Sequence, residues 1–120
     1  MSHAVLKAVA HRTFASLPPD VRKTLNAVKV RMAPLGRDDY GRRTLGCTAY
    51  DGNQIVLDTR TVERYAGAGE EFLEDVLGHE FAHAYRARRK LADMDDEVGE
   101  EIEADNLARQ WGFNSKKGSR

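Results

Sequence analysis

The chain has 120 residues, of which 41% are apolar and 32% are charged, as is typical of one globular domain. Its 19 basic and 19 acidic residues cancel, so net charge gives no reason to expect nucleic acid or an anionic membrane as a partner. The single cysteine, Cys47, excludes an intrachain disulfide. Neither a signal peptide nor a membrane-spanning stretch is visible in the sequence, so we expect a cytoplasmic protein.

The first half of the chain is predicted to form two short helices followed by a small sheet. Helical periodicity over residues 4–17 ends at two prolines, and residues 20–26 suit a second helix. Apolar and charged residues alternate over 28–33, which is the period of a strand. Two further strands, 44–50 and 54–58, flank an Asp-Gly pair that favours a tight hairpin turn. These strands predict a small, mostly antiparallel three-stranded sheet.

The second half is predicted to be helical. A short segment at 61–65 leads into a long helix from about residue 70 to residue 90, and an acidic connection follows. The last helix ends at Gly112, a residue that suits a left-handed helix stop. The chain is therefore predicted to be one α+β domain over residues 1–113, with a helical segment at 1–26, a sheet at 28–58 and helices at 61–113. Residues 114–120 are predicted to be a flexible basic tail.

The long helix contains the segment LGHEFAH, in which two histidines stand four residues apart. His79 and His83 therefore lie one turn apart on one face, where a single zinc ion at about 2.0–2.1 Å from each can bind both. Glu80 points to a neighbouring strip, from which it can act on a zinc-activated water as general base. The alternative interpretation is a pair of interior histidines that are satisfied by hydrogen bonds.

No histidine follows His83, so a carboxylate after residue 90 must supply the third metal ligand. On a helical wheel, Glu101 and Asp105 fall within the apolar arc that contains Val98 and Ile102. Burying a carboxylate without a partner costs several kcal/mol, so these acids are expected to pair or to bind a metal. We assign Glu101 as the third ligand.

Asp105 lies one turn beyond Glu101. It is expected to accept a hydrogen bond from His79 or His83, which would orient that imidazole and raise its basicity. The alternative for Asp105 is an ion pair with Arg109 on a solvated face. Three other acids in this part of the chain compete with Glu101 for the ligand role (Glu97, Glu100 and Glu103).

With HEFAH and EEIEAD placed on successive helices, the chain resembles zinc metallopeptidases of the gluzincin type. It is similar in particular to the single-domain minigluzincins and to the ImmA/IrrE-like peptidases of bacterial mobile elements. The two motifs match the family patterns H-E-x-x-H and E-x-E-A-[DN] at seven positions (His79, Glu80, His83, Glu101, Glu103, Ala104 and Asp105). The resemblance implies a zincin-like fold, with Glu101 as a zinc ligand and strand 54–58 as the sheet edge along which an extended polypeptide substrate lies.

The predicted function is that of a zinc endopeptidase, with one Zn²⁺ per chain and Glu80 as general base. The oxyanion needs a further donor, for which nearby arginines and four tyrosines are candidates (Tyr40, Tyr50, Tyr65 and Tyr85). One alternative is a non-catalytic domain that zinc stabilises for binding another protein. Another is a latent peptidase whose cleft is covered by helix 4–17 or by the charged loop 36–43. The sequence specifies neither the oligomeric state nor the cleavage specificity.

Overall fold

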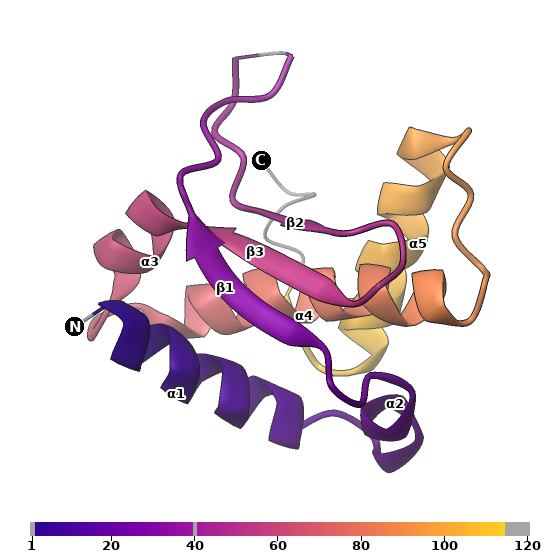
Figure 1. Ribbon diagram of the computed structural model, residues 1–120, viewed down its shortest axis with the longest axis horizontal. Coiled ribbons are helices and arrows are strands. Elements are labelled where there is room, and N and C mark those ends of the chain that lie inside the picture. Colours follow the sequence, from indigo (N-terminus) through magenta and orange to yellow (C-terminus); the bar gives the residue numbers. More distant parts are fainter. Residues whose placement is uncertain (1, 40, 115–120) are drawn as a thin grey trace.

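The computed structural model describes residues 2–39 and 41–114, so Tyr40 and the predicted tail beyond Asn114 lie outside the described residues (Figure 1). Helices and strands combine in the α+β arrangement that the sequence predicts. The elements follow in the order α1 (Ser2–Ala15), α2 (Pro19–Thr24), β1 (Lys29–Ala33), β2 (Gly46–Thr48), β3 (Gln54–Asp58), α3 (Thr59–Tyr65), α4 (Glu70–Arg88) and α5 (Glu97–Gln110). Within the described ranges, no helix is both long and apolar enough to cross a membrane.

The sheet has the strand order β1–β3–β2. β2 pairs antiparallel with β3, as the hairpin signal predicts, whereas β1 pairs parallel with β3. The prediction of a mostly antiparallel sheet is therefore wrong for the pairing of β1 with β3. This pairing is parallel because β3 inserts between β1 and β2, the two strands that precede it. The expectation that 54–58 forms a sheet edge is wrong for the same reason. The edges are β1 and β2.

Arg88 of α4 links the loop between β2 and β3 to α4 and to the end of α2. Gly52, in the loop between β2 and β3, has a φ of 74° and lies so close to α4 that a Cβ would come within 2.7 Å of Ala84 O. Arg88 of α4 donates to the Gly52 carbonyl at 3.0 Å. The same guanidinium donates to Thr24 O and Asn26 O, at 2.9 and 2.7 Å. It therefore holds the end of α2 and the hairpin loop against the end of α4.

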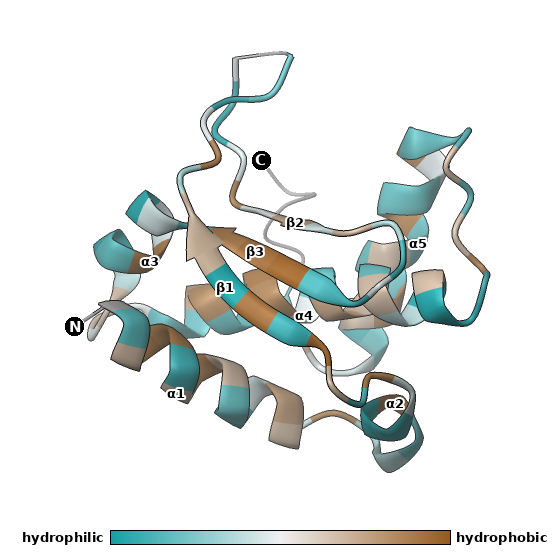
Figure 2. Ribbon diagram, viewed as in Figure 1, coloured by the Kyte–Doolittle hydropathy of each residue, from teal (hydrophilic) through white to brown (hydrophobic). Residues whose placement is uncertain are grey.

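The hydrophobic core lies around α4, which contacts the other four helices and both strands of the hairpin (Figure 1). Hydrophobic residues dominate the central strand β3, where Ile55 and Leu57 are fully buried (Figure 2). α1 packs against α3, α4 and β1 and buries Leu6 and Val9. α1 is therefore an integral part of the hydrophobic core.

The Phe113 ring, just beyond the C-terminal end of α5, packs on α4. Gly112 has a φ of 101°, and the Phe113 N–H donates to Ala108 O at 3.0 Å, which is the left-handed helix stop that the sequence predicts. The Phe113 ring lies directly on Gly78 of α4, where a Cβ would approach it to 2.4 Å. Since Gly78 precedes His79, this contact sets the position of α5 beside the histidine-bearing turn.

We expect Gly78→Ala to lower the free energy of unfolding by about 1–3 kcal/mol, because the added methyl group must displace the Phe113 ring. Phe113→Ala removes that ring, so the double variant should be more stable than the sum of the two single changes predicts. Urea-induced unfolding of the wild type, both single variants and the double variant measures this coupling. Strictly additive effects would show that the two residues do not interact.

Candidate metal centre

α4 and α5 bring the three predicted metal ligands, His79, His83 and Glu101, close together. The Nε2 atoms of His79 and His83 are 3.1 Å apart. Glu101 places Oε1 3.0 Å from Nε2 of His79 and Oε2 2.9 Å from Nε2 of His83. Two nitrogens that share one zinc ion at about 2.0–2.1 Å each lie no more than about 4.2 Å apart. The separations therefore fit a single ion between the three groups.

Each histidine turns its other ring nitrogen toward an acid of α5. Nδ1 of His83 lies 3.5 Å from Oε2 of Glu100, and Nδ1 of His79 lies 3.8 Å from Oδ1 of Asp105. The second distance is too long for a hydrogen bond, and the buried Nδ1 of His79 has no hydrogen-bond partner among the described residues. Oδ2 of Asp105 also lies 3.4 Å from Arg109. Asp105 therefore lies near both of the partners considered for it, His79 and Arg109, with one carboxylate oxygen toward each.

The face of α5 that packs on α4 is displaced from the predicted apolar arc. Val98 and Ile102, which the wheel placed inside, are 73% and 54% exposed. The side chain of Glu101 is 55% exposed and lies at the rim of the packed face, not within it. The three buried positions of α5 are two alanines of the predicted arc and a charged residue at its edge (Ala104, Ala108 and Glu100), so the packed face is shifted toward Glu100.

Glu100, which the sequence analysis considered only as a competing ligand, is instead the buried partner of an arginine. It is only 7% exposed, and Arg86 of α4 donates to both of its carboxylate oxygens, each at 3.0 Å. Burial raises the pKa of Glu100, but the hydrogen bonds from Arg86 and from the Asp93 N–H outweigh it and hold the pKa below its ordinary value. A signal was present, since Glu100, Ala104 and Ala108 are spaced by four and small residues mark close helix contacts.

Glu80 lies next to His79 in the chain, and a residue of the sheet holds its carboxylate in place. It is 1% exposed, and the Thr48 hydroxyl of β2 donates to its Oε1 at 2.8 Å. Gly46, on the same strand, leaves space for this side chain, because a Cβ there would lie 3.2 Å from Cγ of Glu80. β2 therefore both accommodates and orients Glu80.

A cavity of about 250 Å³ opens over these groups. Its walls come from β2 and the loop that follows it, from α4, and from the connection and first turns of α5. Glu80, His83 and Glu101 line it. Of the described tyrosines considered as oxyanion donors, Tyr50 alone lines this cavity. The other two pack on aromatic rings elsewhere, Tyr65 on Phe72 and Tyr85 on Trp111.

The two segments that the latent-peptidase alternative uses as a cover lie elsewhere. Among the residues that the structure describes, neither helix 4–17 nor loop 36–43 lines the cavity. α1 packs beside β1, at the sheet edge opposite β2 (Figure 1). The geometry therefore gives no support to a latch made of these segments.

Comparison with known proteins assigns neither a family nor a function to this chain. The chain matches no known protein family, and no significant match was found among curated proteins or solved structures. The function has to be argued from the arrangement of the site itself.

We expect Arg86→Met to lower the free energy of unfolding by about 3–5 kcal/mol at neutral pH, because it leaves the Glu100 carboxylate buried without its cation. The folded-state pKa of Glu100 is lowered, so the pair stabilises the fold above the ordinary glutamate pKa of about 4.3, and this contribution is lost as the pH falls. The difference between wild type and variant should therefore shrink in acid. Denaturant unfolding at pH 7 and at pH 4 measures it, with Arg89→Met, an exposed change in the same helix end, as control. An equal loss at both pH values would contradict the assignment.

Proposed function

We propose that this chain is a zinc-dependent peptidase that cleaves extended polypeptides, with His79, His83 and Glu101 as the metal ligands. The observation that carries the proposal is the approach of two imidazole nitrogens and one carboxylate to 2.9–3.1 Å, beside the buried carboxylate of Glu80. Zinc bound there would supply the Lewis acid that polarises a peptide carbonyl and activates water. Across the described residues, the group suited to a metal ion has these three members, which favours an open, catalytic site over a closed, structural one.

Glu80 is the general base in this proposal. Glu80 lines the cavity and its carboxylate is fixed by the Thr48 hydroxyl, so it can take a proton from the attacking water and deliver it to the leaving amine. Tyr50, at the rim of the same cavity, is the described tyrosine that can offer a hydroxyl to the developing oxyanion. Thr48 acts through Glu80 and is a positioning residue.

The strand suited to the substrate is β2, not 54–58 as the resemblance implied. β2 is an edge of the sheet, runs antiparallel to β3 and lines the cavity with its three residues. A peptide that adds to the open edge of β2 would pass over Glu80 and the ligand histidines. An edge strand, a histidine-bearing helix and a glutamate-bearing helix in this arrangement support the zincin-like architecture that the two motifs imply.

The ligand set can be tested by elemental analysis of purified protein after zinc is offered. Wild type should hold about one zinc per chain, and Glu101→Ala should lose it because two histidines alone bind the ion weakly. Glu103→Ala is the matched control, since this acid is exposed on the same helix and should leave the zinc in place. A wild-type protein that takes up no zinc would remove the proposal.

The role of Glu80 can be separated from metal binding. We expect Glu80→Gln to keep its zinc and to hydrolyse an unstructured protein such as casein about 10²–10⁴-fold more slowly, because the proton acceptor is lost. Glu97→Gln, which changes another acid lining the same cavity, should retain both zinc and most of the activity. Undiminished hydrolysis by the Glu80 variant would refute its assignment as base.

A further inference from the structure

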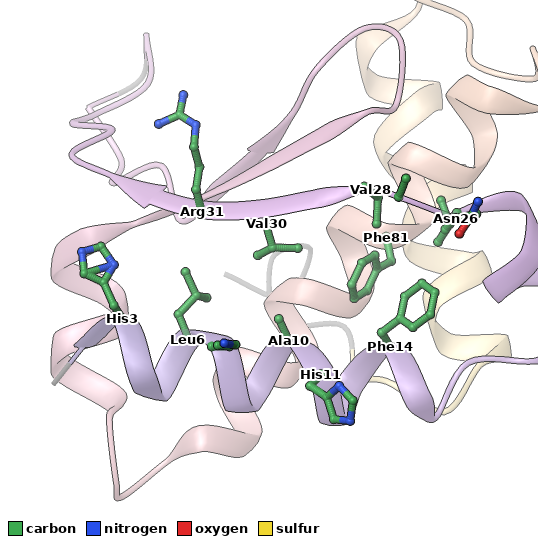
Figure 3. Close-up of a pocket in the computed structure, with 13 residues that line it drawn as sticks. His3, Leu6, Ala10, His11, Phe14, Asn26, Val28, Val30, Arg31 and Phe81 are labelled. Atoms are coloured by element: carbon green, nitrogen blue, oxygen red, sulfur yellow. The ribbon is translucent and has the colours of Figure 1, made fainter.

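A second and larger cavity, of about 540 Å³, lies between α1 and β1 (Figure 3). Its volume is within the range of about 300–1,000 Å³ that is common for ligand sites. Phe14 of α1 and Phe81 of α4 meet there edge to face, with ring centroids 6.0 Å apart. The floor is apolar and is contributed by both helices and by the strand (Leu6, Ala10, Phe14, Val28, Val30 and Phe81).

The wall that α1 contributes carries two parallel stripes. Leu6, Ala10 and Phe14 are spaced by four and form the apolar stripe, and the exposed residues His3, Lys7 and His11 follow the same spacing beside it. From residue 3 to residue 14 the helix rises about 16 Å, the length of a strand of about five residues. No acidic side chain is among the described residues that line this groove.

The opposite wall is the open edge of β1. β3 is the one strand of the described sheet that pairs with β1. The Lys29 N–H points toward β3, where it donates to Asn53 O at 3.0 Å. Because the backbone groups of successive strand residues point to alternate sides, those of Val30 and Met32 point to the open edge. This edge can therefore accept another strand.

Charge distinguishes the kind of strand that fits. The exposed residues Lys29 and Arg31 lie on β1, and Figure 3 shows Arg31 pointing away from α1 while Val30 points toward it. A strand along this edge would have Lys29 and Arg31 on one face and Lys7 near the other. A second copy of β1 would bring like charges together, which is destabilising. An acidic strand would find complementary charge.

We propose that this groove binds an extended acidic polypeptide segment, which adds a strand to the open edge of β1. Its alternate apolar side chains would lie against Leu6, Ala10 and Phe14, and its acidic side chains would face Lys29 and Arg31. The groove lies at the sheet edge opposite the zinc cavity. The inference therefore does not depend on the proposed peptidase activity.

The probe is a capped eight-residue peptide of alternating valine and glutamate, titrated into ¹⁵N-labelled full-length protein. We expect amide shifts at residues 28–32 and along α1. The same peptide with lysine in place of glutamate should bind at least about 10-fold more weakly, because it meets like charge. Mass spectrometry of the peptide after the titration shows whether it was cleaved.

Two variants test the two halves of the inference. The double change Lys29→Glu and Arg31→Glu should weaken binding of the glutamate peptide at least about 10-fold. The matched control, Lys23→Glu with Arg60→Glu, changes exposed cations of α2 and α3 and should not weaken it. Val30→Pro removes an N–H at the open edge and should abolish binding, with thermal unfolding as a check on its fold.

Three results would overturn the proposal. One is the absence of amide shifts at millimolar peptide. Another is a shift map centred on β2 and Glu101, which would make the peptide a ligand of the zinc cavity. The third is binding of decanoate in the groove while the peptide does not bind, which would identify a site for small amphiphiles.

Discussion

The close packing of α5 on α4 is the constraint on which the site depends, because the proposed ligand atoms come from both helices. The histidines are four residues apart on α4, but Glu101 reaches them only when α5 lies at one height and one rotation. Gly78 admits the Phe113 ring at one end of the contact, and Ala104 and Ala108 keep the helices close along its length. A side chain larger than these at the interface would move Glu101 away from both imidazoles.

The same interface also contains the pair Glu100–Arg86, in which two charged groups are largely removed from water. Such a pair gains little in stability over an apolar contact, but breaking it costs several kcal/mol, so it favours one arrangement of the helices over others. Oε2 of Glu100 lies 3.5 Å from Nδ1 of His83, so this arrangement also fixes the surroundings of a histidine. Packing and the polarity of the site are therefore determined by the same few residues.

Local patterns predicted the helices, the hairpin and the helix stop at Gly112, because each depends on residues near one another in the chain. The parallel pairing of β1 with β3 depends on which strand inserts between two others, which no local pattern records. The contact between Thr48 and Glu80 joins residues 32 apart, and it too arises only from the tertiary fold. The wheel failed at Val98 and Ile102 because it assumes that large apolar residues are buried, whereas the buried residues of α5 are two alanines and a paired acid.

The division of the three proposed ligand residues between α4 and α5 has a thermodynamic consequence. An ion held by both helices binds the docked state and not the undocked one, so its binding free energy adds to the stability of the contact between them. By the same linkage, any substitution that loosens this contact weakens the affinity for the ion, even when it changes no ligand. Affinity for the proposed ion would then report on the integrity of a helix interface that extends well beyond the site, and without that ion the fold would open first at α5.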